Sequence, residues 1–170
     1  MTDYRNAFRT NLKLLLRFFM PPLCVACEKE IDDGLLCGDC YDQIVIASQP
    51  LCQTCGRPLN ERKICKICKK MKPSFDRIRT WALFVPPIDK IVHAFKYERK
   101  PSLSNLIGRS MARILESDPL LNSVRYLVPV PLYKGRERDR GYNQAELLTR
   151  VIKQETKKEI LNCLIRTRNT

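Results

Sequence analysis

The sequence predicts an α/β fold in two parts, a small cysteine-rich module followed by a larger basic α/β domain. Eight of the nine cysteines fall in the first part as four Cys-x-x-Cys pairs. In the second part, short apolar runs typical of strands alternate with segments of helical periodicity. The Pro73-Ser74 dipeptide marks the boundary. We therefore divide the chain into residues 1–20, 21–72 and 73–170.

The first of these segments predicts an amphipathic helix at Tyr4–Met20. Its apolar side chains fall on one face and its basic side chains on another, and Pro21-Pro22 ends the pattern. We expect this helix to pack on the cysteine-rich module or on a partner. A basic amphipathic helix can also lie on a membrane surface.

The cysteine pairs form an internal repeat, because nine residues separate the first pair from the second and nine separate the third from the fourth. Tetrahedral Zn²⁺ needs four soft ligands at one point, and a two-residue gap aims two thiolates at one metal. We predict two structural zinc ribbons in which neighbouring pairs share an ion. A cross-braced arrangement, first pair with third and second with fourth, is the alternative. The predicted ligands are Cys24, Cys27, Cys37 and Cys40 for one ion, and Cys52, Cys55, Cys65 and Cys68 for the other.

Other uses of the cysteines fit less well. Disulfides need an oxidising compartment, and the apolar run Leu14–Met20 is too short for a secretory signal and is broken by Arg17. A thioredoxin-like motif needs one pair rather than four in tandem. Iron–sulfur ligation stays open, although the even repeat favours zinc. No run approaches the length of a transmembrane helix. We expect a cytoplasmic protein, with peripheral attachment to the inner face of the membrane as an alternative.

Positive charge is concentrated in the C-terminal part. Residues 1–70 carry 11 Lys/Arg against 8 Asp/Glu, whereas residues 71–170 carry 20 against 10. A four-thiolate zinc site has a net charge of about −2, so the ribbon region becomes nearly neutral once two ions are counted. The basic α/β domain is therefore the part expected to attract polyanions such as nucleic acid or phosphorylated metabolites.

Apolar patterns predict six elements in the α/β domain. In the cysteine-rich module, Gly56 directly follows the third cysteine pair, and we expect it to adopt a positive φ. Cys163, in the last strand, is expected in the core. The predicted elements are a strand at Phe75–Val85, a helix through Ile88–Phe95, a helix capped by Ser102, a strand at Tyr126–Pro131, a helix from Ala145 and a strand at Glu159–Arg166.

A charged loop connects the strand at Tyr126–Pro131 to the helix that follows it. Strand, loop, helix and strand form a βαβ unit, and ligands of open α/β sheets bind beyond the carboxyl ends of the strands. Guanidinium groups suit phosphate, so the loop predicts an anion site. The alternative is a surface loop whose Glu137 and Asp139 pair with its own arginines. The predicted anion contacts are Lys134, Arg136, Arg138 and Arg140, with Gly141 and Asn143 shaping the loop.

Several motifs in this order are similar to one known family. They are the paired Cys-x-x-Cys module, Phe75-Asp76, the run His93–Tyr97, the run Val128–Leu132 and the run Arg138–Ala145. The chain resembles the ComF family of bacterial competence proteins. The resemblance implies a double zinc ribbon followed by a type I phosphoribosyltransferase-like parallel sheet, a role in natural transformation and the handling of single-stranded DNA. It also implies that the loop at Leu132–Arg140 helps to hold the pyrophosphate of phosphoribosyl pyrophosphate (PRPP).

One family feature is not found in this sequence. ComF proteins carry an acidic, glycine-containing PRPP loop that nothing in these 170 residues resembles. We therefore expect a partial phosphoribosyltransferase-like domain in a shortened family member. We assign no catalytic residue, and magnesium with PRPP is expected only of a complete homologue.

The leading function hypothesis is a role in DNA uptake through binding of single-stranded DNA or phosphoribosyl compounds. A Mg²⁺-dependent phosphoribosyltransferase is one alternative. The other is an interaction module whose zinc ribbons dock a helicase or another protein of the DNA uptake machinery. The sequence indicates no particular oligomeric state.

Overall fold

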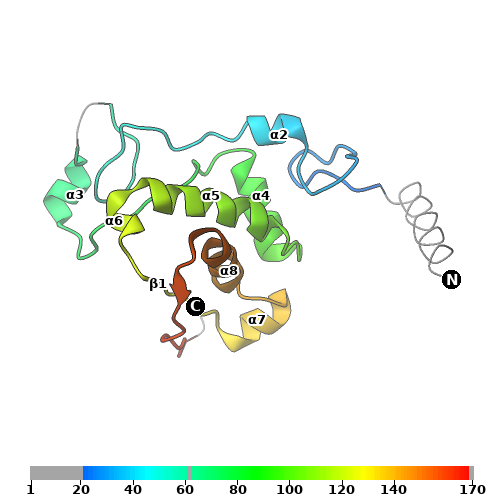
Figure 1. The fold of residues 1–170 in the computed structure, drawn as a ribbon. Helices are drawn as coiled ribbons and strands as arrows, with labels where there is room; N and C mark the ends of the chain where they lie inside the picture. The colour runs from blue at the N-terminus through cyan, green and yellow to red at the C-terminus, as the bar shows by residue number, and fades with distance from the viewer. Residues whose placement is uncertain (1–20, 61–62, 169–170) are drawn as a thin grey trace.

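The computed structural model describes residues 21–60 and 63–168 (Figure 1). The helix predicted at Tyr4–Met20 lies outside them. No helix in the described ranges is long and apolar enough to cross a membrane. In chain order the elements are α2 (Gly38–Asp42), α3 (Lys66–Met71), α4 (Ile88–Tyr97), α5 (Leu103–Ser117), α6 (Pro119–Asn122), β1 (Tyr126–Leu127), α7 (Lys134–Arg140), α8 (Gln144–Thr156) and β2 (Glu159–Ile160).

The cysteine-rich module consists of two similar lobes, the first ribbon (residues 21–44) and the second ribbon (residues 49–72). Each contains a single antiparallel bridge, Leu23 with Glu30 in the first and Leu51 with Pro58 in the second. These bridges occupy equivalent places, because each residue of the second ribbon follows its counterpart by 28 positions. The repeat of the sequence is therefore a repeat of structure. Helices α2 and α3, which end the two ribbons, lie well apart in Figure 1.

The strand predicted at Phe75–Val85 is wrong. This segment instead runs beside the connector between the two ribbons, where the Ala47 N–H donates to the Trp81 carbonyl at 3.0 Å. Only one isolated bridge, between Ile46 and Ala82, forms there. The segment does alternate between apolar and polar residues. It forms no strand because the neighbouring connector is irregular and does not offer a continuous series of backbone hydrogen bonds.

The main core forms around α4, as the apolar spacing of this helix predicts. Ile91 is fully buried, and Ile44, which follows α2 of the first ribbon, belongs to the same cluster. Leu35 and Leu36 of the first ribbon pack against it. The first ribbon therefore shares a hydrophobic core with the helical part. The buried members of the cluster are Ile44, Ile88, Ile91, Ala94, Phe95 and Leu103.

Helices α5 and α8 pack closely against each other and form the largest helix–helix contact of the described residues. At their crossing a Cβ on Gly108 would come within 2.7 Å of the Val151 Cβ, so only glycine permits this approach. The helix predicted after Ser102 is confirmed as α5. Ser102 itself makes no side-chain capping bond, so that detail of the prediction is wrong.

The predicted βαβ unit is present, with β1 and β2 paired in parallel in the register Tyr126 with Glu159 and Leu127 with Ile160. Both strands have two residues, so they are much shorter than predicted. Prolines at 129 and 131 explain the early end of β1, because they have no N–H to donate to a ladder.

Two further predictions for the C-terminal half are wrong. The charged loop contains a helix, α7, because its lysine, arginine and glutamate residues are good helix formers. Gly141, at φ +84°, ends that helix in a left-handed conformation. Cys163 is exposed rather than buried, since β2 ends three residues before it.

Candidate metal centres and basic hollow

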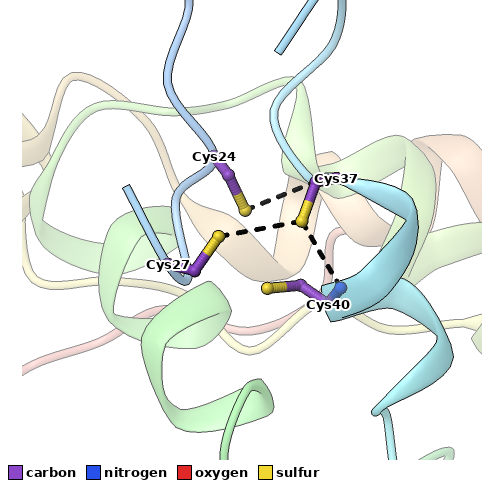
Figure 2. Close-up of side chains that lie close together, drawn as sticks. All are labelled: Cys24, Cys27, Cys37 and Cys40. Carbon is purple, nitrogen blue, oxygen red and sulfur yellow. Dashed lines mark hydrogen bonds between the residues drawn. The ribbon is translucent and has the colours of Figure 1, made fainter. Parts of the chain in front are cut away.

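The first ribbon brings four cysteine sulfur atoms together. The sulfurs of Cys24, Cys27, Cys37 and Cys40 all lie within 4.8 Å of one another. Figure 2 shows the four side chains converging, two from the loop that follows the bridge residue Leu23 and two from the start of α2. The Sγ atoms of Cys27 and Cys37 are 3.7 Å apart.

Backbone N–H groups point at these sulfurs. The Cys37 N–H donates to the Cys24 Sγ at 3.4 Å, and the Cys40 N–H donates to the Cys37 Sγ at 3.4 Å. The second bond caps the N-terminus of α2, so the same cysteine begins the helix and contributes to the cluster. Such donors stabilise a thiolate over a thiol.

The second ribbon repeats this arrangement at Cys52, Cys55, Cys65 and Cys68. The Cys65 N–H donates to the Cys52 Sγ at 3.3 Å, and the Cys68 N–H donates to the Cys65 Sγ at 3.4 Å. Here the Sγ atoms of Cys55 and Cys65 are 3.8 Å apart. The third cysteine again caps a helix, in this case α3.

Both clusters fit zinc. A tetrahedral ion with Zn–S bonds of about 2.3 Å requires sulfurs about 3.8 Å apart, close to the separations found in both ribbons. Four thiolates complete the coordination sphere, which leaves no position for a substrate, so the two ions are structural. Neighbouring pairs share each ion, as predicted, and the cross-braced alternative is wrong.

The thiols of each cluster differ in their affinity for protons. Burial raises the pKa of Cys24 and of Cys52, but backbone N–H donors outweigh it and hold each pKa at about 6. For Cys40 and Cys68 burial dominates, and the neighbouring sulfurs add to it. The pKa of Cys68 rises to about 12, and that of Cys40 rises in the same direction. Each site therefore joins one thiol that ionises readily, Cys24 or Cys52, to one that holds its proton more tightly, Cys40 or Cys68.

A buried ion pair fixes the second ribbon to the helical part. Arg79 donates to the carbonyl oxygen of Cys52 at 3.3 Å, and its Nε lies 2.8 Å from Asp118. Arg77 contacts the other oxygen of the same carboxylate at 2.7 Å. Asp118 also caps α6, so one carboxylate connects the ribbon to the α5–α6 junction. The sequence alone does not predict this interaction, because Arg77 and Asp118 are about 40 residues apart in the chain.

Gly56 makes a second close contact between this ribbon and the chain after it. Its φ of +70° confirms the expected positive value. A Cβ at this position would lie 2.7 Å from the carbonyl oxygen of Ile78. Glycine is needed here both for backbone conformation and for space.

The residues predicted to contact anions lie in and after α7. Arg136 and Arg138 are exposed, as is Lys134. Asn143 is buried, and its Oδ1 accepts the Ala145 N–H at 3.0 Å, so it caps α8 rather than facing solvent. Gly141 ends α7 and Asn143 begins α8, so the two residues form the junction between these helices.

A basic hollow of about 500 Å³ lies between α7 and the end of α4. The Arg140 guanidinium stacks over the Tyr97 ring at 5.0 Å and donates to Gln144 Oε1 at 2.8 Å. Lys96 and Tyr97 are not among the residues predicted from the sequence for this site. The helical periodicity of α4 could have indicated them, because it places both residues on the exposed side of the helix near its C-terminus. The residues that line the hollow are Lys96, Tyr97, Gly135, Arg136, Asp139 and Arg140.

Known proteins resemble both parts of this chain. The double zinc ribbon domain family matches residues 15–69, which include both cysteine clusters. Competence protein F of Haemophilus influenzae is 30% identical over 134 residues, which cover 75% of this chain and 51% of that protein. Both matches are consistent with a protein of the ComF family.

Other relatives of this chain have related names. DNA utilization protein YhgH of Escherichia coli is 27% identical over 135 residues, 76% of this chain and 59% of that protein. Competence protein ComFC of Bacillus subtilis is 29% identical over 126 residues, 68% of this chain and 50% of that protein. The chain thus spans between half and three fifths of the length of these relatives. No solved structure matches it.

Proposed function

We propose that this chain is a member of the ComF family that takes part in DNA uptake and holds single-stranded nucleic acid through the basic hollow. The names of the relatives, competence protein F and DNA utilization protein, support the role in uptake. The observation that carries the binding proposal is the hollow itself, where Lys96, Arg136 and Arg140 converge from two helices. Cations held on rigid elements suit a phosphate backbone better than the same charges on a mobile loop.

The Arg140–Tyr97 pair supports a single strand over a duplex. Tyr97 is 60% exposed and lies in the same hollow as the cations. Unpaired bases stack on exposed aromatic rings while their phosphates pair with nearby cations, an arrangement typical of single-strand binding. In a duplex the bases are already stacked inside the helix, so they do not stack on the Tyr97 ring.

Fluorescence anisotropy with a labelled single-stranded oligonucleotide tests the proposal. Arg136→Ala combined with Arg140→Ala should weaken binding about tenfold for each guanidinium that is removed from a phosphate. The matched control is Arg113→Ala with Lys153→Ala, which removes the same charge from exposed positions outside the hollow. Equal weakening by both pairs would contradict the proposal, because only overall charge would then matter.

Phosphoribosyl compounds share the phosphate chemistry of this site. Competition distinguishes them from nucleic acid: an oligonucleotide held in the hollow should be displaced by unlabelled single strand at much lower concentration than by PRPP with Mg²⁺. Displacement by PRPP at the lower concentration would assign the hollow to phosphoribosyl compounds instead.

A further inference from the structure

The internal repeat allows the two ribbons to be compared position by position. In the first ribbon, Leu36 packs against the core around α4 and Ile44 is buried in it. Their counterparts 28 positions later are Ile64, which is 44% exposed, and Lys72, which is exposed. The face that the first ribbon uses for packing within the chain is therefore open in the second.

An exposed apolar stripe follows this face along α3. Ile64, Ile67 and Met71 are 44%, 48% and 74% exposed. Ile67 and Met71, four residues apart, lie on one side of α3, and Ile64 lies just before Cys65, the residue that caps this helix. The small core of the second ribbon contains its cysteines and Leu59, and it does not include the stripe. Exposed aliphatic side chains grouped in this way are typical of interaction surfaces.

Lysines flank the apolar stripe. Lys66 and Lys70, four residues apart, lie on one side of α3, and Lys63 precedes the helix; all three side chains are exposed. Helix α3 contains no acidic residue, whereas α2, its counterpart in the first ribbon, carries Asp39 and Asp42 and no lysine. The helix of the ribbon that packs on the core is therefore acidic, whereas the equivalent helix of the second ribbon, which does not pack there, is basic.

We infer that the apolar stripe of the second ribbon binds a partner protein through an acidic segment with aliphatic side chains. The lysines pair with the carboxylates, and Ile64, Ile67 and Met71 receive the apolar side chains. This surface is separate from the basic hollow, so the inference does not rest on the proposed function.

Charge and chemistry exclude the other occupants. A second copy would bring lysines against lysines in a two-fold contact. The N-terminal segment of this chain, with four Lys/Arg against one Asp in residues 1–20, would also be repelled. Single-stranded nucleic acid needs aromatic rings for base stacking, and the stripe has none.

Two synthetic peptides test the inference on the zinc-loaded chain. One alternates Asp-Glu pairs with leucine, and the other has serine in place of each leucine. By fluorescence anisotropy, the leucine peptide should bind at least about tenfold more tightly, because each buried aliphatic side chain contributes roughly that factor. Equal affinities would overturn the inference, since attraction would then be electrostatic alone.

Variants of the stripe locate the binding. Ile67→Ser with Met71→Ser should weaken the leucine peptide about tenfold or more and leave oligonucleotide binding unchanged. Both side chains are exposed, so zinc content should stay at two ions, which is measured in parallel. Tyr41→Ser, at an exposed position of the first ribbon, is the matched control and should have no effect. Loss of oligonucleotide binding with unchanged peptide binding would assign the stripe to nucleic acid instead.

Discussion

In each ribbon, the first and the last cysteine of the repeat differ in how tightly they hold a proton. Burial raises the pKa of both Cys24 and Cys40, but at Cys24 the backbone N–H donors outweigh it and lower the pKa from 9.0 to about 6. A lowered pKa contributes stability that is complete above the ordinary value and is lost as the pH falls through the lowered one. Protons therefore compete with zinc in mildly acidic solution.

We predict that zinc transfer to a chromogenic chelator becomes faster as the pH falls from about 8 to about 5. The change should be steepest below pH 6, because bound zinc keeps Cys24 and Cys52 ionised below the pKa of about 6 that they have without metal. Transfer that is equally fast across this range would show that the N–H donors do not hold the thiolates.

Asp118 connects the second ribbon to the helical part through Arg79, which also donates to the Cys52 carbonyl. Burial raises the pKa of its carboxyl, but the Arg77 hydrogen bond, the Leu121 N–H and the two guanidinium charges lower it below its ordinary value of 3.8. The stability from this carboxylate is complete above about pH 4 and is lost as the pH falls further.

Asp118→Asn leaves two arginines facing a neutral group, with side chains only 24% and 10% exposed. We expect the free energy of unfolding to fall by about 3–5 kcal/mol at neutral pH, measured by denaturant titration. The difference from the parent should shrink in acid, where the parent carboxyl is protonated. Asp42→Asn, on the exposed face of α2, is the control and should change little.

Residue identity predicted the metal ligands well, because the spacing of cysteines reflects the local geometry of a knuckle. It did not predict every residue that lines the basic hollow. Lys96 and Tyr97 come from a helix about 40 residues before Arg136 and Arg140, and no local pattern joins them. Asn143 looked like part of an anion loop, but its side chain serves to cap α8.

Among the secondary-structure elements, the helices were predicted better than the strands. The apolar spacing that predicts α4, α5 and α8 depends on each helix's own periodicity, and all three are confirmed. Strands depend on a partner, and the sequence cannot show whether one exists. Phe75–Val85 alternates like a strand, yet its neighbour is an irregular connector with one bridge to it.

The two ribbons should differ in how much the rest of the fold depends on them. The first ribbon places Leu35 and Leu36 on the core around α4, whereas the second has its own small cluster. We predict that Cys40→Ser lowers the amide hydrogen-exchange protection of Ile91 and Ala94 by at least about 2 kcal/mol, because apolar packing on α4 is disrupted.

Cys68→Ser is the matched variant, since it removes the equivalent ligand from the second ribbon. It should release one zinc ion as well, yet leave the amides of α4 almost as well protected as in the parent. Equal loss of protection in the two variants would show that both ribbons support the core to the same degree.

The whole molecule joins a nearly neutral metal module to a strongly basic helical part. Helix α4 connects the two, because its buried face packs on the first ribbon and its C-terminal end contributes to the basic hollow. Charge asymmetry in the sequence predicted which half should attract polyanions. The shared core was not predictable, since it depends on contacts between distant segments.

The salt dependence of oligonucleotide affinity tests the central claim most directly. For single strands, the logarithm of affinity falls with the logarithm of salt concentration with a slope of about −0.7 for each phosphate contact. Arg136→Ala with Arg140→Ala should make the slope less steep by about 1.4, whereas Arg113→Ala with Lys153→Ala should leave it unchanged. An unchanged slope in the first pair would contradict binding at the hollow.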